Sequence, residues 1–408
     1  MGLFENNNPS EWKNLDITWE KNEAELYVVS GLDFQEKSDL KEVIIRLVAQ
    51  EDAPTFENLK EINIASAGVK ECVIVDQPLL EKVSLNDLGK APLTAVNIQG
   101  GKAIHSIDIK DLPEVTDVFL GGDSLINVEL ADLPNLQEQS NLHFRVPYNG
   151  NGLKESHIQN LTLSGNLSKL NDLYLNDLGF QSFNLETTLP EATGISLNKN
   201  RLTGTLDLKG LQKLTSLYLR NNQLQSISIS DCPTLKEFDA SSNKSPESLT
   251  LDLSSLTHLD ASETALTSLD ITHLTALKNI SVSQSKLSTL TFDSNNKALE
   301  RINLSNNALT SFVLPAEINQ PYQNYLSGNQ LKTLDLKHAG SLEELYISNN
   351  ELETFILPYE KRNARHHRMR WQPPHREFLE KHRRELYRIV RLARSSSVHS
   401  QPCKRPPG

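Results

Sequence analysis

Asparagine recurs at a nearly fixed interval through the second half of the chain, and this period limits the possible folds more than any other feature. The steps between neighbouring slots are 21 or 22 residues. A repeat of this length predicts a solenoid, in which each unit buries its apolar residues against its neighbours. The slots are Asn200, Asn222, Asn243, Thr264, Ser285, Asn307, Asn329 and Asn350.

Each slot sits in the same local pattern. Residues 214–224 read Leu-x-x-Leu-x-Leu-x-x-Asn-x-Leu, and residues 299–309 and 342–352 repeat this with Ile in one position. The Leu-x-Leu pair predicts a short strand whose apolar residues point to one side, and stacked units would form a parallel sheet. An amide both donates and accepts, so the asparagines are expected to satisfy buried backbone groups at the turns rather than to bind a ligand.

A second short apolar segment follows each asparagine, as at 206–208, 334–336 and 355–357. A unit of 21–22 residues with two extended segments has no room for a helix of ordinary length. The predicted fold is therefore a mostly β solenoid with strands and turns on both sides.

These units resemble leucine-rich repeats. They are similar to the bacterial repeats of Bacteroidetes surface proteins and, less closely, to internalins. The resemblance covers residues 59–357 and implies the α/β-solenoid class: a right-handed solenoid with a parallel concave sheet and an extended convex side. It also implies a secreted or cell-surface bacterial protein, involved for example in adhesion, that binds a protein or carbohydrate partner on the concave face.

The flanking and early segments are less regular. Residues 1–58 precede the repeats and are expected to cap them, with 39–48 as either strand or helix. About fourteen units are expected in 59–357. The motif starts at Leu80 and again only 13 residues later at Leu93, which predicts a truncated unit. Residues 136–160 depart from the pattern and contain the turn signal Asn-Gly-Asn-Gly, so we expect one repeat with an inserted loop.

The segment 358–408 breaks the pattern. Residues 361–408 hold 14 Lys and Arg against 3 acidic residues, a net charge of +11, which leaves −22 for the rest of the chain. Three interpretations stay open. The segment is a frame-shifted or artificial end; it is a C-terminal cap with an apolar helical face between 378 and 393; or it is a basic segment for an anionic membrane or a nucleic acid.

The chain shows no pattern typical of catalysis. Its three cysteines lie far apart and make no disulfide framework or metal spacing. His366, His367 and His375 lie close together without a partner ligand, and the sequence has no phosphate loop, nucleophile elbow or zinc-protease motif. We expect a non-enzyme without cofactors. The start of the chain lacks the pattern of a signal peptide, so a cytoplasmic location is the alternative to export.

The outward positions of the predicted strands are the candidate binding residues. Tyrosine supplies rigid contact area with a polar tip, although it also favours β structure on a merely solvated face. Acidic residues in the middle favour a cationic or neutral partner, and the −22 charge of residues 1–360 argues against nucleic acid. The candidates are Tyr174, Tyr218, Arg220, Glu237, Asp239, His258, Asp260, Arg301, Tyr325, Glu344 and Tyr346.

The rival functions are an intracellular scaffold or host-directed effector with a basic targeting tail, and a truncated multidomain enzyme. The oligomeric state stays open.

Overall fold

The described parts of the chain form a coil of parallel strands. A computed structural model describes residues 16–21, 27–33, 43–48, 59–65, 69–75, 77–86, 93–100, 102–122, 124–137, 142–145, 158–185, 189–244, 248–318, 323–339, 342, 344–356 and 370–372. Every regular element within these ranges is a β-strand. The chain divides into an N-terminal unit (1–224 and 229–234) and a C-terminal unit (225–228 and 235–408). Strand β18 (Gln223–Ser230) has residues in both.

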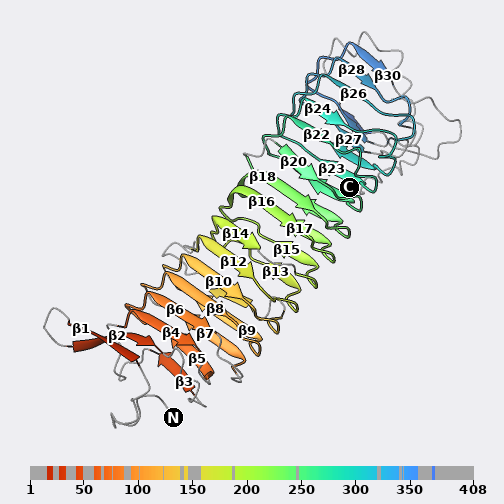
Figure 1. The fold of residues 1–408 in the computed structure, drawn as a ribbon. Helices are drawn as coiled ribbons and strands as arrows, with labels where there is room; N and C mark the ends of the chain where they lie inside the picture. Colours follow the sequence, from red (N-terminus) through yellow and green to blue (C-terminus); the bar gives the residue numbers. More distant parts are fainter. Residues whose placement is uncertain are drawn as a thin grey trace, which may run out of the picture. The chain divides into compact units, whose positions relative to one another are not determined.

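In the N-terminal unit, β1 and the even-numbered strands up to β14 stack into one sheet, to which β16 does not belong (Figure 1). Its order is β1-β2-β4-β6-β8-β10-β12-β14, antiparallel between β1 and β2 and parallel thereafter. The bounds are β1 Asp16–Lys21, β2 Tyr27–Asp33, β4 Glu61–Ala65, β6 Lys82–Asn86, β8 Ser106–Lys110, β10 Asn127–Ala131, β12 Asn160–Ser164 and β14 Ser182–Leu185, and β16 is Thr203–Lys209.

The odd-numbered strands of this unit form separate parallel sheets. One has the order β11-β9-β7-β5-β3, and β13, β15 and β17 follow one another in a second. The bounds are β3 Val43–Val48, β5 Val69–Val75, β7 Ala95–Gln99, β9 Asp117–Gly121, β11 Leu142–Arg145, β13 Asp172–Tyr174, β15 Gly194–Ser196 and β17 Ser216–Tyr218.

This arrangement corrects the prediction of a truncated unit. The motifs that begin at Leu80 and Leu93 lead into β6 and β7, which belong to different sheets. Each partner is one coil away: β6 pairs with β4 and β8, and β7 pairs with β5 and β9. The 13-residue step is therefore the distance between the two sides of one coil. Sequence spacing alone could not separate the sides because both carry the same apolar pattern.

In the C-terminal unit the odd strands have the order β19-β21-β23-β25-β27-β29-β31, and even strands pair as β22-β24 and β26-β28-β30. Each pair with a described register is parallel. The bounds are β19 Glu237–Asp239, β20 Ser248–Leu251, β21 His258–Asp260, β22 Ser268–Asp270, β23 Asn279–Ser281, β24 Thr289–Thr291, β25 Arg301–Asn303, β26 Ser311–Val313, β27 Gln323–Tyr325, β28 Thr333–Asp335, β29 Glu344–Tyr346, β30 Thr354–Ile356 and β31 Arg370–Gln372.

The asparagines hold successive coils together, as predicted. In the N-terminal unit, Asn200 Nδ2 donates to the carbonyls of Leu175 (2.7 Å) and Leu197 (2.9 Å), and Oδ1 accepts from Leu178 N–H (3.0 Å). Asn222 bridges the next pair of coils in the same way. The same geometry recurs at Asn329 and Asn350 of the C-terminal unit. Each of these amides is buried, so each replaces water for backbone groups that would otherwise lack partners.

The ends of the chain fall mostly outside the described residues. Residues 43–48 are strand rather than helix, and β2 and β3 pair with β4 and β5. Most of 1–58, the Asn149–Gly152 turn and the apolar face at 378–393 lie outside the described ranges. Of the tail, only β31 is described: it pairs with β29, with Trp371 in register with Leu345. The cap at 1–58 and the three interpretations of the tail stay predictions.

Candidate functional site

The outward positions of the odd strands form the candidate site. In β25 the inward Ile302 is 1% exposed, while Arg301 is exposed and Asn303 half-buried. This alternation recurs in β19, β21, β23, β27 and β29, because successive side chains of a strand point to opposite faces. Burial of the inward residues therefore determines which residues face outward, and the outward residues do not have to pack in the core.

Two tyrosines of the C-terminal unit form a stacked pair. Tyr325 and Tyr346 are register partners on β27 and β29, and their ring centroids lie 4.7 Å apart with an 8° angle between the planes. This separation matches the spacing of neighbouring strands, about 4.8 Å. The two rings therefore stand side by side on the outer surface, both half-buried.

Glu344 fixes this pair. Its Oε2 accepts a hydrogen bond from the Tyr325 hydroxyl (2.9 Å) and another from Gln323 Nε2 (3.2 Å). Partial burial, and then the hydrogen bond and negative charge of Glu344, raise the pKa of Tyr325 to about 12. Arg301 opposes this shift through its positive charge. Tyr325, Tyr346, Glu344 and Arg301 thus act as one cluster, which we call the tyrosine cluster, together with Gln323.

The acidic candidates lie on β19 and β21. Glu237 is in register with His258, and Asp239 with Asp260. Each aspartate accepts a hydrogen bond from the backbone N–H two residues on, Asp239 from Ser241 (2.8 Å) and Asp260 from Ser262 (2.9 Å). The Thr257 hydroxyl lies 2.8 Å from His258 Nδ1. These carboxylates help to shape the turns after their strands, so part of the acidic pattern is structural.

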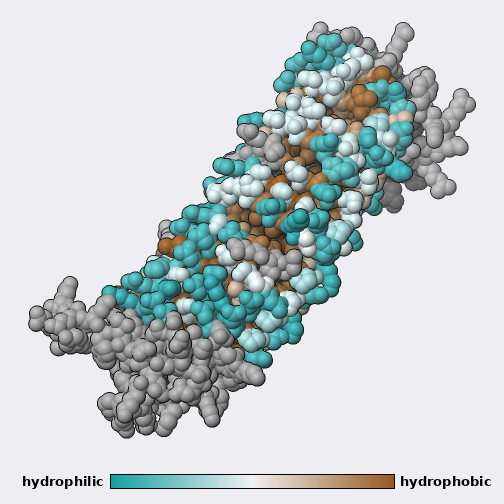
Figure 2. Space-filling model, viewed as in Figure 1, coloured by the Kyte–Doolittle hydropathy of each residue, from teal (hydrophilic) through white to brown (hydrophobic). Residues whose placement is uncertain are grey.

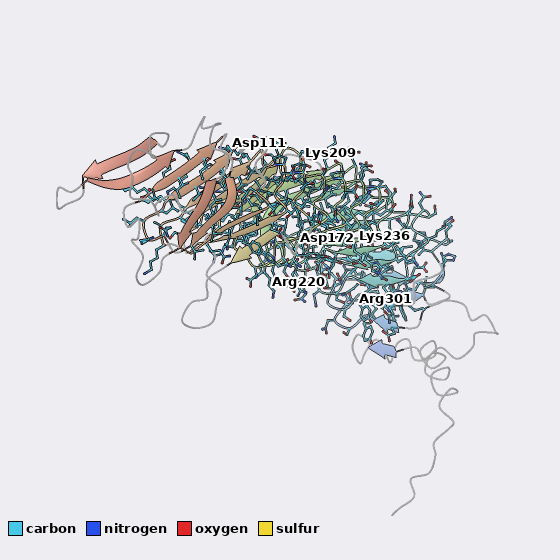
Figure 3. All side chains as sticks on the ribbon, turned by 90° about the horizontal axis from the view of Figure 1, so that it is seen from below. Asp111, Asp172, Lys209, Arg220, Lys236 and Arg301 are labelled. Atoms are coloured by element: carbon cyan, nitrogen blue, oxygen red, sulfur yellow. The ribbon has the colours of Figure 1, made fainter. Side chains whose placement is uncertain are left out.

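The remaining candidates belong to the N-terminal unit. Tyr174 on β13 is 43% exposed, and Tyr218 on β17 is half-buried. Arg220 follows β17 and is exposed; its backbone N–H donates to Asn198 Oδ1 (2.7 Å). In Figure 3, Arg220 lies on the edge of this unit opposite to Asp111 and Lys209, which come from the even-strand side.

Sequence reasoning missed two features of the outer surface. Gln323 belongs to the tyrosine cluster, and the sequence could have indicated this only through its position two residues before the outward Tyr325. On the five-stranded sheet of the N-terminal unit, the rings of Phe119 and His143 stack at 4.8 Å and 11°. The sequence did not indicate this stack because residues 136–160, which include His143, were predicted to form a repeat with an inserted loop.

Metal-ligand groups and membrane-spanning helices can be assessed only within the described ranges. They contain no group of three or more His, Cys, Asp or Glu side chains that could hold a metal ion. Over the same residues, no helix has the length and apolar character of a membrane span. Cys72 and Cys232 are buried and form no disulfide within the described residues, and burial raises the pKa of the Cys232 thiol.

Comparisons with known proteins agree on the repeat. The family model of the leucine-rich repeat matches residues 213–235 and 341–360. No curated protein matches the chain at a significant level.

Among solved structures, a leucine-rich repeat protein of Leptospira interrogans is 17% identical, covers 82% of this chain and 94% of its own, and has a TM-score of 0.34. The leucine-rich effector YopM of Yersinia pestis is 20% identical over 82% of this chain and 89% of its own, with a TM-score of 0.45. The functional domain of InlJ from Listeria monocytogenes is 17% identical over 79% of this chain and 68% of its own, with a TM-score of 0.29. The matched repeats, the asparagine ladder and the stacked parallel strands together show that the chain contains leucine-rich repeats and has the fold of a leucine-rich repeat solenoid.

Proposed function

We propose that the chain is a non-catalytic binding protein and that the tyrosine cluster of its C-terminal unit contacts a protein partner. The observation that carries this proposal is the stacked pair of Tyr325 and Tyr346, held by Glu344 on the outer surface of β27 and β29. Aromatic side chains with a polar tip dominate the binding energy of many protein interfaces.

The cluster is ordered before a partner arrives. Stacking fixes the ring planes, and the hydrogen bonds to Glu344 fix the positions of Tyr325 and Gln323. Immobilising a rotamer-rich side chain on binding costs about 0.5–1.5 kcal/mol. A partner that docks on this cluster avoids part of that cost.

The charges around the cluster indicate the character of the partner. Acidic side chains on β19 and β21 and Glu344 on β29 belong to the same odd-strand surface of the C-terminal unit. Complementary potentials increase the rate of encounter and reject partners of the same sign. The proposed partner is a protein with a neutral or basic contact surface. The remaining candidates, Tyr174, Tyr218 and Arg220, belong to the odd-strand surface of the N-terminal unit.

The resemblance to surface and secreted repeat proteins supplies the proposed location, which is outside the cell or on its surface. Fractionation of the native host into cytoplasm, envelope and medium tests this part. Recovery from the cytoplasm alone would support the intracellular scaffold instead.

A library selection tests the binding surface. Displayed peptides are selected on the wild-type protein and then measured against Tyr325→Ser/Tyr346→Ser, which removes both rings. The matched control is Val313→Ser/Ile356→Ser on β26 and β30 of the same unit, because these side chains are 57% and 42% exposed. Figure 2 shows hydrophobic surface over these strands.

The proposal expects selected peptides to lose at least tenfold in affinity for the tyrosine variant, a loss of about 1.4 kcal/mol. Their affinity for the control variant should be unchanged. Peptides that bind all three proteins equally, or that lose affinity only for the control variant, would contradict the proposal. A selection that yields no binder would contradict it as well.

A further inference from the structure

In the N-terminal unit, the side chain of Tyr174 on β13 lies across the neighbouring strand β15 instead of staying above β13. Its register partner on β15 is Ser196. Nevertheless, its hydroxyl lies only 3.3 Å from the place where residue 194 would carry a Cβ. Diagonal neighbours in a sheet are about 7–8 Å apart. The ring must therefore lean over β15, and it can do so because residue 194 is glycine.

The burial of β15 shows the same arrangement. Gly194 and Ser196 face outward by register, yet both are buried, and Ser196 is only 3% exposed. The outward residues of β17, Ser216 and Tyr218, are half-buried. Side chains of β13 cover the outer face of β15 at Gly194, where the Tyr174 hydroxyl and Asp172 Oδ1 both lie 3.3 Å from the Cβ position of residue 194. Because Tyr174 itself is 43% exposed, it presents an aromatic surface to solvent above a closed floor.

Polar groups surround this aromatic surface. Asp172 Oδ1 accepts hydrogen bonds from Gly194 N–H (2.7 Å) and the Thr193 hydroxyl (2.7 Å). Asn176 Oδ1 accepts from Ser196 Oγ (2.7 Å) and Asn198 N–H (2.7 Å). Within the described part of the chain, Asp172 Oδ2 and Asn176 Nδ2 make no hydrogen bond of their own. The site thus holds one acceptor and one donor in fixed positions beside an aromatic ring.

We propose that Tyr174 is the stacking platform of a carbohydrate site, with Asp172 and Asn176 as its polar contacts and a hexopyranose ring as the ligand. A pyranose has an apolar face of C–H groups and a rim of hydroxyls. The weakly positive C–H groups can stack on the face of an aromatic ring, which carries the negative part of its charge distribution. The hydroxyls both donate and accept, so they match Asp172 Oδ2 and Asn176 Nδ2.

The local charge favours a sugar over a cationic side chain. Asp172 already accepts two hydrogen bonds, which reduces its attraction for a further cation. The exposed Lys199 and Arg220 follow β15 and β17 on the same side of the unit. Their backbones are joined by the Lys199 N–H to Arg220 carbonyl bond (2.8 Å). The carboxylates of Asp172 and of the exposed Asp177, which follows Asn176, balance the charges of Lys199 and Arg220. The site therefore does not select for positive charge, whereas a neutral polyol is compatible with all four residues.

Saturation-transfer NMR on the full chain tests the proposal. The probes are the methyl glycosides of glucose, galactose, mannose and N-acetylglucosamine, with sialic acid as an acidic arm. We expect transfer from protein to the C–H face of at least one neutral glycoside. Tyr174→Ala should weaken that binding by roughly tenfold or more, whereas Tyr174→Phe should keep it within about threefold because the ring face remains.

Gly194→Val tests the platform without removing the ring. The added side chain occupies the floor and lifts Tyr174, so binding should fall to the level of Tyr174→Ala. Leu79→Ala, which truncates a side chain of similar exposure (44%) elsewhere in this unit, should bind like the wild type. Melting curves of all variants confirm that they fold.

Three results would overturn the proposal: no transfer to any neutral glycoside, binding that survives Tyr174→Ala, or binding equally reduced by Leu79→Ala. Transfer to sialic acid alone would also overturn the choice of a neutral ligand. The outcome is independent of the protein-binding proposal because no residue of the tyrosine cluster is changed.

Discussion

The N-terminal unit closes its coils in two different ways, and the contrast explains what the sequence does and does not reveal. After β8 and β10, the turns use aspartates with positive φ, Asp111 (54°) and Asp132 (51°), followed by the buried Leu112 and Leu133. Backbone bonds such as Asp111 N–H to Ala131 O (3.1 Å) connect the coils there. After β15, backbone bonds such as Lys199 N–H to Arg220 O (2.8 Å) connect the coils as well, and after β15 and β17 the buried amides of Asn200 and Asn222 add side-chain bonds between coils.

The difference has a physical cause. A leucine at the turn extends the core, but its side chain cannot form hydrogen bonds with backbone groups. An asparagine side chain supplies both a donor and an acceptor, so it fits only the position in each repeat where both find a backbone partner. The coils that carry these asparagines have three-residue odd strands, such as β15 and β17, whereas β5, β7 and β9 of the earlier coils have five or seven residues.

The largest expected effect comes from placing a charge in the core. Leu304, adjacent to β25, is 0% exposed. Leu304→Asp should lower the free energy of unfolding of the C-terminal unit by about 4 kcal/mol or more, because it removes a buried apolar group and buries an unpaired carboxylate. Denaturant unfolding measures this loss. Asn303→Asp, the outward neighbour, is the control and should stay within about 0.5 kcal/mol of the wild type; equal losses in both would show that our register is wrong.

Breaking one asparagine turn should have the next largest effect. Asn222→Ala removes the hydrogen bond that the Leu202 N–H donates to the amide and one hydrogen bond from each of the carbonyls of Leu197 and Leu219, while the Leu197 carbonyl keeps its bond from Asn200. We expect a loss of about 2–4 kcal/mol in the free energy of unfolding. The exposed neighbour Gln223→Ala should change it by less than about 0.5 kcal/mol. If both variants melt alike, the amide is not what joins these coils.

One buried asparagine lies outside the ladder and should act in the opposite direction. Asn324 occupies the inward position of β27 that Ile302 and Leu345 fill on β25 and β29. It is 0% exposed, and neither its Oδ1 nor its Nδ2 has a hydrogen-bond partner among the described residues. Asn324→Leu should therefore raise the free energy of unfolding by about 1–2 kcal/mol. A destabilised variant in thermal unfolding would mean that this amide has a role that the core position does not explain.

The smallest predicted effect is a shift in titration. Tyr325 should ionise near pH 12, because burial and then Glu344 favour the neutral phenol. Its pKa is raised in the folded state, so the resulting stabilisation is present below about pH 10, the ordinary tyrosine value, and is lost as pH rises toward 12. Ultraviolet titration of the wild type against Tyr325→Phe isolates this phenol. Glu344→Gln should bring its pKa back toward 10, and an unchanged value would show that Glu344 does not control the cluster.

The asparagine coils were predictable in detail, and the rest of the fold was not. The period from Asn200 to Asn350 fixed the odd strands, their inward leucines and the outward tyrosines, because a buried amide tolerates only one register. The coils before β13 have no such marker, so two sides of one coil were taken as successive units. For the site, the outward positions of Tyr325, Glu344 and Tyr346 could be predicted. The stacking geometry and the place of Tyr174 over Gly194 depend on neighbours that only the structure brings together.

Hydroxyl-radical footprinting with a bound partner peptide tests the central claim most directly. In the complex with a peptide selected on the wild-type protein, Tyr325 and Tyr346 should lose reactivity. Val313 and Ile356, exposed on the even strands of the same unit, should react as in the free protein. Protection of Val313 and Ile356 with unchanged tyrosines would contradict the assignment of binding to the odd-strand surface.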